Sequence, residues 1–304
     1  MAAVAQPDPV LSDGIRDPSI RLVGGQWHLF FTTVVGNTPQ WGLAQSASAD
    51  LRQWSAPVSW TQSGVQGLAS PDVTRRPDGT YVAVYQSDPG ETDPPGQDKL
   101  YYRTSADMRQ WSTPRRLMPG LHAAPSDRLI DAALAWTDHG LMLGYKFGIK
   151  DGTQHFEIAW SPSSSLDGPW IYVGRPNITV YGDTSENYQF QRIDGVWDLL
   201  ATSNTLDRPW LFTLHGNPND AKGWLSWSGG RELQVPAEHW NFAIGVNSIN
   251  YERSNGAYLC DARKIDGHFY LFYFGTNELR SYGGWGHTFL GVARSTNLVT
   301  WNAP

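Results

Sequence analysis

The amino-acid sequence predicts an all-β protein, a five-bladed β-propeller of four-stranded antiparallel blades, because two features recur along it. The first is a tryptophan that returns after 57, 59, 57 and 74 residues, mostly in a frame such as SADLRQW or SADMRQW. These residues are Trp54, Trp111, Trp170, Trp227 and Trp301. The second is an acidic residue 37 to 41 positions before each tryptophan, at Asp17, Asp72, Asp131, Glu186 and Asp261. A period of this size is typical of repeat architectures, among them the propeller.

Each repeat is expected to begin with a β-hairpin. An apolar or aromatic run follows every acidic residue, and a turn dipeptide such as Gly24-Gly25 or Asp194-Gly195 precedes each run. Such dipeptides between β-rich runs are strong hairpin signals. We therefore expect the acid near the start of the innermost strand and the tryptophan at the end of the outermost one. The expected blades, together one domain, are 12–60, 61–118, 119–175, 176–230 and 231–304.

Composition narrows the class of protein further. The 304 residues are 40% hydrophobic and 17% charged, with a net charge of −6, which disfavours a nucleic-acid partner. No run of 18 apolar residues predicts a membrane span. Cys260 is the only cysteine, so neither an intrachain disulfide nor a cysteine zinc site is expected. An Ala-Val-Ala stretch near the start resembles the end of a signal peptide. We expect a secreted protein, with a cytoplasmic one as the alternative, and the sequence specifies no oligomeric state.

The recurring acids are candidate functional residues. The innermost strands of a propeller line its central channel, so acids at their starts would gather carboxyl groups around one axis. A single acid at a strand start often only accepts a hydrogen bond from the turn backbone. Recurrence in five repeats favours a functional set instead. Clustered carboxylates repel one another, and this repulsion lets an acid and a base coexist at one pH.

Four short motifs, in this order, resemble glycoside hydrolase family 43, whose clan also includes families 62, 32, 68 and 117. The motifs are Arg16-Asp17-Pro18-Ser19, Ser70-Pro71-Asp72-Val73, Leu129-Ile130-Asp131-Ala132 and Ser185-Glu186-Asn187-Tyr188. The resemblance covers about residues 12–304. It implies that Asp17 is the general base, that Asp131 modulates the pKa of the acid, and that Glu186 is the general acid. The negative charge of Asp131 is expected to favour the protonated form of Glu186.

The resemblance also implies a geometry and two departures from the family pattern. Family 43 inverts the anomeric configuration, which implies roughly 6.5–9.5 Å between the carboxyl groups of Asp17 and Glu186. Asn187 stands where the family commonly has glycine, so the turn beside the acid is expected to differ. The fifth repeat lacks the histidine segment that helps many members to hold a calcium ion. No cofactor is expected to be required, and a structural calcium, with His287 as a weak candidate ligand, is left open.

The high tryptophan content, 15 residues, suggests a sugar ligand, since sugars stack on aromatic rings while polar groups fix their hydroxyls. The candidate substrate-binding residues are Asp72, Asp261, Arg263, Trp210, Trp240 and Trp285. Inter-blade packing is the alternative for the tryptophans. For Arg263 an ion pair with an acid is as good an interpretation as a substrate clamp, and for Arg16 the ion pair is preferred.

The predicted function is that of an inverting, exo-acting glycoside hydrolase that removes terminal pentosyl residues from an oligo- or polysaccharide. An α-L-arabinofuranosidase or a β-xylosidase is the leading case. A galactofuranosidase, an endo-arabinanase and an anhydro-galactosidase are alternatives of the same fold. A non-catalytic carbohydrate- or protein-binding propeller is the alternative from another class, disfavoured because a lectin needs no matched acid and base.

Overall fold

The computed structural model describes residues 15–34, 41–60, 67–87, 98–149, 154–178, 185–203, 208–234, 256–275 and 289–302. Within these ranges the regular structure is β-strand apart from two short helices, η1 (Ala221–Leu225) and α2 (Arg263–Asp266). The predicted all-β class is therefore confirmed. In the same ranges no helix has the length and apolar character needed to cross a membrane.

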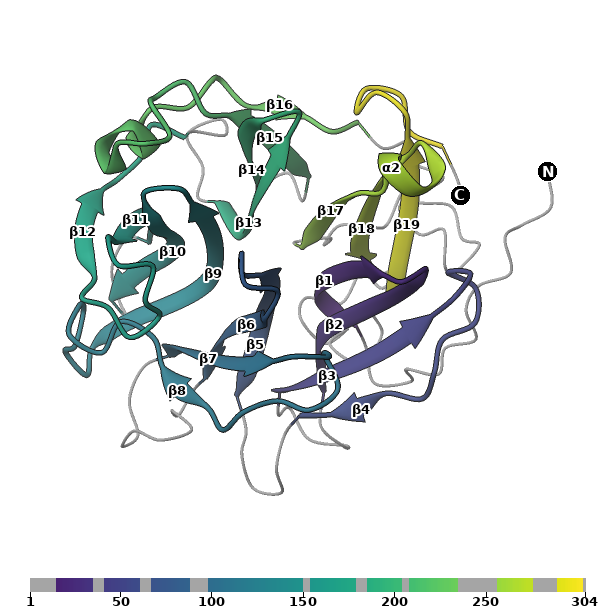
Figure 1. Cartoon of the computed structure of the whole chain (residues 1–304), viewed down its shortest axis with the longest axis horizontal. Helices are drawn as coiled ribbons and strands as arrows, with labels where there is room; N and C mark the ends of the chain where they lie inside the picture. The colour runs from purple at the N-terminus through teal and green to yellow at the C-terminus, as the bar shows by residue number, and fades with distance from the viewer. Residues whose placement is uncertain are drawn as a thin grey trace. The chain divides into compact units, whose positions relative to one another are not determined.

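The strands form five sheets, and the strand order in each sheet follows the chain (Figure 1). The first blade has β1 (Arg16–Val23), β2 (Gln26–Val34), β3 (Trp41–Ser48) and β4 (Val58–Ser59). The second has β5 (Leu68–Arg75), β6 (Tyr81–Ser87), β7 (Lys99–Ser105) and β8 (Arg115–Arg116). The third has β9 (Asp127–Thr137), β10 (Gly140–Ile149), β11 (His155–Ser161) and β12 (Ile171–Gly174).

The fourth blade has β13 (Ser185–Ile193), β14 (Val196–Ser203), β15 (Pro209–Thr213) and β16 (Arg231–Glu232). The fifth has three strands among the described residues, β17 (Ala257–Asp261), β18 (Phe269–Gly275) and β19 (Phe289–Ser295). Consecutive strands pair antiparallel, as β1–β2, β6–β7 and β10–β11 do. This repeat of antiparallel sheets confirms the predicted five-bladed propeller. The fourth blade ends at Glu232, two residues beyond the predicted boundary.

The chain divides into two compact units. The first comprises Met1–Ala69, Thr202–Pro209 and Glu232–Pro304, which hold the first and fifth blades. The second comprises Ser70–Ala201 and Trp210–Arg231, which hold the third blade and most of the second and fourth. That the whole chain is one domain stays a prediction.

The predicted hairpins at Gly24-Gly25 and Asp194-Gly195 are present, but the recurring tryptophans do not end the last strands. Trp54 lies between β3 and β4, and Trp227 between β15 and β16. The frame around these residues is a turn held by side chains. In SADLRQW, Ser48 Oγ accepts a hydrogen bond from Leu51 N (2.9 Å) and Asp50 Oδ1 accepts one from Gln53 N (2.8 Å). Leu51 has the left-handed φ of 64° that this turn requires.

The same turn recurs wherever the frame does, which explains the repeat in the sequence. In the second blade Asp107 Oδ1 accepts from Arg109 N (2.9 Å) and from Gln110 N (3.0 Å). In the fifth blade the side chain of Asn297 takes the place of the aspartate and accepts from Thr300 N (2.9 Å). The residues that recur in this frame therefore specify a loop conformation.

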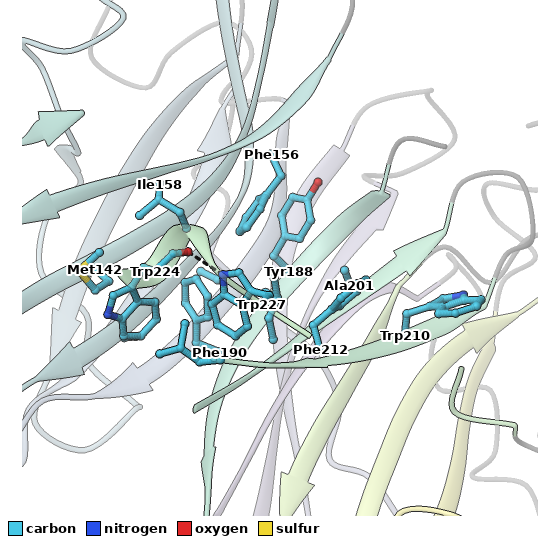
Figure 2. Packing of buried hydrophobic residues seen from close by; sticks show 14 residues of the cluster. Met142, Phe156, Ile158, Tyr188, Phe190, Ala201, Trp210, Phe212, Trp224 and Trp227 are labelled. Carbon is cyan, nitrogen blue, oxygen red and sulfur yellow. Dashed lines mark hydrogen bonds between the residues drawn. The ribbon is translucent and has the colours of Figure 1, made fainter. Parts of the chain in front are cut away.

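An aromatic core joins the third and fourth blades within the second unit (Figure 2). Phe190 meets Trp224 edge to face, with ring centroids 5.2 Å apart, and Trp227 Nε1 donates to the carbonyl of Trp224 (2.6 Å). Gly144 in β10 is required here, because a Cβ atom would lie 2.6 Å from the ring of Phe156 and 2.9 Å from that of Phe190. This packing fixes β13 against β9 and β10, and so positions the candidate site.

Candidate active site

One unusual backbone conformation recurs in the first strands of four blades. The residues that adopt a left-handed φ of 48° to 53° are Asp17, Ser70, Asp131 and Asn187. In β9 this residue opens a β-bulge, since the pairing moves from Ile130 opposite Lys146 to Ala133 opposite Gly144, which leaves two residues opposite one. The register of β1 shifts in the same way at Asp17. Bulges re-aim side chains and are frequent beside active sites.

The acids themselves do not share one register position. Asp17 and Asp131 are the left-handed residues, whereas Glu186 precedes the left-handed Asn187 and Asp72 lies two residues after the left-handed Ser70. The expectation that the acids recur in register is therefore wrong for Glu186 and Asp72. Asn187 replaces the glycine of the family pattern, and asparagine is among the residues that reach this conformation most readily. The turn beside Glu186 is thus compatible with the one a glycine would form.

Asp261 does not open its strand but ends it. It is the last residue of β17, opposite Phe269. Arg263 donates to both of its carboxylate oxygens, from Nε to Oδ1 (2.9 Å) and from Nη2 to Oδ2 (2.7 Å). Burial opposes ionisation, yet these hydrogen bonds hold the pKa of Asp261 below its usual value. The prediction that Asp261 lies at a strand start was therefore wrong. Of the two interpretations of Arg263, an ion pair and a substrate clamp, the structure has the ion pair.

In the first unit, Asp17 is held by its own blade. Thr32 Oγ1 donates to Asp17 Oδ2 (2.7 Å) across the β1–β2 pair. The guanidinium of Arg16 lies over the rings of Trp41 (5.3 Å) and Phe274 (5.0 Å). Gly256 gives β17 its close approach to β1, because a Cβ atom there would lie 3.2 Å from the Cα of Asp17. The position of this carboxylate therefore depends on both blades of the unit.

In the second unit, Glu186 on β13 is paired with a lysine that the sequence analysis did not single out. Lys146 Nζ on β10 donates to Glu186 Oε2 (3.2 Å). The lysine is almost fully buried, with 2% of its surface exposed, while the glutamate side chain is 20% exposed. The available signal was a lysine inside the apolar run from Leu141 to Phe147. To predict an ion pair between two blades, one has to know how their strands are aligned, and the sequence of one strand does not show this.

Asp131 lies near the same point as Glu186. Its own backbone N–H donates to Gln86 Oε1 on β6 (3.1 Å), and the residue is 5% exposed. Burial first, and then the charges of Asp131 and Glu186, raise the pKa of Tyr188 well above its usual value. The tyrosine hydroxyl donates to the carbonyl of Ser185 (2.6 Å). Asp131 and Glu186 therefore both act electrostatically on Tyr188, and Lys146 holds Glu186 by a hydrogen bond.

The remaining predicted residues fall in different places. Asp72 is 4% exposed, and its Oδ2 accepts from the backbone of Leu134 (3.2 Å), so it ties β5 to β9. Trp210 on β15 is 9% exposed and belongs to the aromatic core, a place that favours packing over sugar stacking (Figure 2). Trp240, Trp285 and His287 lie outside the described residues.

No group of three or more His, Cys, Asp or Glu side chains that could hold a metal is found among the described residues. A structural calcium ion, with His287 as a candidate ligand, stays a prediction.

Solved structures of known proteins share this fold. An α-L-arabinofuranosidase from Podospora anserina, in complex with cellotriose, superimposes with a TM-score of 0.65 and 16% identity, covering 100% of this chain and 96% of that one. An endo-arabinanase from Bacillus licheniformis gives 0.60 and 16%, covering 95% of each chain. A xylan β-1,4-xylosidase from Bacillus halodurans gives 0.63 and 17%, covering 98% of this chain. This chain spans only 56% of the length of that xylosidase.

The sequence itself matches no protein-family model, and no curated protein is similar enough to match it. At the identities above, the structural likeness establishes the fold. The chain has the five-bladed propeller fold of glycoside hydrolase families 43 and 62. Because three activities occur on this fold among the structures compared, the activity of this chain has to be argued from its site.

Proposed function

We propose that the protein is an inverting, exo-acting glycoside hydrolase that removes terminal pentosyl residues, as an α-L-arabinofuranosidase or a β-xylosidase does. The observation that supports it best is that Asp131 and Glu186 stand on two first strands in contact with each other, β9 and β13, where Lys146 holds Glu186 by a hydrogen bond. A propeller that only binds sugar has no need of two carboxyl groups so placed. The solved structures that share the fold include an α-L-arabinofuranosidase and a xylan β-1,4-xylosidase, which agrees with this substrate class.

In the proposed mechanism, Glu186 donates a proton to the glycosidic oxygen while Asp17 accepts one from the attacking water. The water attacks the anomeric carbon from the face opposite the leaving group, so the configuration inverts. Thr32 donates a hydrogen bond to Asp17 Oδ2 and so helps to orient the carboxylate that accepts the proton. Asp131 acts on the acid through its charge. General acids and bases contribute about 10²–10⁴-fold each.

The substrate is proposed to be an oligo- or polysaccharide with a pentosyl residue at its end, and a secreted site of action is part of this proposal. An endo-arabinanase, a galactofuranosidase and an anhydro-galactosidase are the alternatives of the same fold. An endo-arabinanase would release oligosaccharides first, whereas the proposed exo-acting enzyme releases monosaccharide only. The other two alternatives would release a sugar other than a pentose.

A panel of para-nitrophenyl glycosides tests the proposal. We expect release of para-nitrophenol from an α-L-arabinofuranoside or a β-xyloside by the native protein, and a loss of about 10²-fold or more in Asp17→Asn. Glu232→Gln, which neutralises a carboxylate on β16, is a matched control that should keep its turnover. A native protein that binds arabino- or xylo-oligosaccharides yet hydrolyses no glycoside of the panel would favour the binding module instead.

A further inference from the structure

We propose that Lys146 is a positioning residue for Glu186, which fixes the place of its carboxylate and opposes its protonation. The catalytic role of Lys146 rests on the proposed function, whereas its pairing with Glu186 does not. Its basis is the hydrogen bond from Lys146 Nζ to Glu186 Oε2 (3.2 Å), which crosses from the third blade to the fourth.

The burial of Lys146 shows that this contact is built into the fold. A buried ammonium is costly unless it is paired and hydrogen-bonded. Lys146 is 2% exposed and stands in β10, where Tyr145 and Leu143 are each fully buried. A methionine or a leucine would fill the same space without the cost of burying a charge, so packing alone does not explain a lysine at this position. Its partner is Glu186, the second residue of β13, whose side chain is only partly buried.

The bulge in β9 lies directly beside Lys146. Because two residues, Asp131 and Ala132, stand opposite Tyr145, the pairing resumes with Lys146 opposite Ile130. Successive side chains of a strand point to opposite faces, so the tyrosine and the lysine diverge. Tyr145 donates to Glu157 within the third blade (3.3 Å), and Lys146 reaches across to Glu186.

Three titratable groups belong to the strand of Glu186 and to the two strands of the third blade that contact it. They are Lys146 from β10, Asp131 from β9 and Tyr188 from β13. An opposite charge favours the ionised carboxylate, and a like charge favours the protonated acid. Lys146 and Asp131 therefore act on the same carboxyl group in opposite directions. The hydrogen bond from Lys146 to Oε2 also restricts the direction in which Oε1 faces.

The pH dependence of kcat/KM separates this role from simple core packing. In Lys146→Met the alkaline limb of the profile should move to higher pH, because the cation that favours ionised Glu186 is gone. Turnover of substrates with poor leaving groups should fall by up to about 10²-fold, as expected for a displaced catalytic group, and turnover of activated aryl glycosides should fall less. Lys146→Arg, which keeps the cation, should retain the native limb.

Lys99→Met is the matched control, since Lys99 is also a buried lysine (5% exposed) of the second unit but donates to the carbonyl oxygens of Ala124 and Asp127. This variant should lower the melting temperature without moving the limb. The inference would be overturned if the alkaline limb of the pH profile did not move in Lys146→Met, or if it moved by the same amount in Lys99→Met.

A second measurement needs no activity. The melting temperatures of Lys146→Met, Glu186→Gln and the double variant form a cycle, and a direct pair predicts that the double variant loses less than the sum of the two single losses. Additive losses would refute the pairing whatever the enzyme does. Non-additive losses in a protein that hydrolyses no glycoside would retain the pairing and reject the proposed function alone. Lys146→Leu, which also removes the cation, serves in the same cycle should the methionine variant not fold.

Discussion

Asp17 and Asp131 occupy the same backbone position in two different blades. Each is the left-handed residue of a bulge in a first strand, with φ of 48° and 53°, and each is followed by a small or cyclic residue, Pro18 or Ala132. For a residue other than glycine this conformation is uncommon, and it persists where the surrounding structure imposes it. The carboxylates proposed as the base and as the modulator thus both belong to left-handed residues in a β-bulge.

Neutralising the proposed acid should make turnover depend on the leaving group. Glu186→Gln can no longer protonate the glycosidic oxygen, so we expect a loss of about 10²–10⁴-fold for natural oligosaccharides and a much smaller loss for activated aryl glycosides. Asp17→Asn should slow both kinds of substrate alike, since the water is needed for each. Rates for a series of aryl leaving groups measure the difference. Equal losses for all leaving groups in Glu186→Gln would place the acid elsewhere.

Removing the charge of Asp131 should shift the pH profile in the direction opposite to that of Lys146→Met. In Asp131→Asn the like charge near Glu186 is lost, so the acid should ionise at lower pH and the alkaline limb should move toward acid. Each pH unit of movement corresponds to about 1.4 kcal/mol of interaction. A profile of kcat/KM against pH checks this. An unmoved limb with native turnover would leave Asp131 only a structural role.

The left-handed residue beside the acid should tolerate glycine and reject β-branched side chains. Asn187 has φ of 53°, so Asn187→Gly should keep the fold and most of the turnover. Asn187→Val should destabilise the protein by roughly 1–3 kcal/mol, because a branched Cβ clashes in this conformation. Chemical denaturation of the two variants is the measurement. Equal stability of both would show that the backbone relaxes out of the left-handed region.

Stability should fall at acid pH through Glu157. Although its burial opposes ionisation, hydrogen bonds from His122 and Arg175 hold the pKa of Glu157 below its usual value. A carboxyl group with a lowered folded-state pKa stabilises the fold above the usual glutamate range, and this contribution is lost as pH falls through the folded-state value.

Unfolding measured between pH 7 and pH 3 should therefore have a shallower pH dependence in Glu157→Gln than in the native protein. Asp138→Asn, in the exposed β9–β10 turn, is a control that should keep the native slope. If the free energy of unfolding depended on pH equally in Glu157→Gln and in the native protein, Glu157 would not contribute to acid unfolding.

The blade repeat was predictable because its signals are local. A Gly-Gly or Asp-Gly turn between apolar runs specifies a hairpin in any context, and the serine and aspartate of SADLRQW bond to backbone atoms two or three residues away. The role of the frame was misassigned for the same reason. A tryptophan that follows a capped turn has the same spacing as one that ends a strand.

The arrangement of the site was only partly predictable, because it depends on bulges and on register between blades. One residue inserted at Asp131 changes the face to which the adjoining side chains of β9 point, and no local pattern announces this bulge or the contact of β10 with β13. Lys146 was missed on that account. Asp261 was misplaced because spacing alone equated the end of β17 with the starts of the other first strands.

The configuration of the first sugar released tests the central claim most directly. Proton NMR, recorded while the native protein hydrolyses para-nitrophenyl α-L-arabinofuranoside, distinguishes the two anomers before they equilibrate, and Asp17→Asn prepared in parallel excludes a contaminating enzyme. An inverting glycosidase with Asp17 as base and Glu186 as acid predicts that β-arabinofuranose is formed first. Initial formation of the α anomer would contradict the proposed mechanism, and an equal rate in the Asp17→Asn preparation would contradict the assignment of the base.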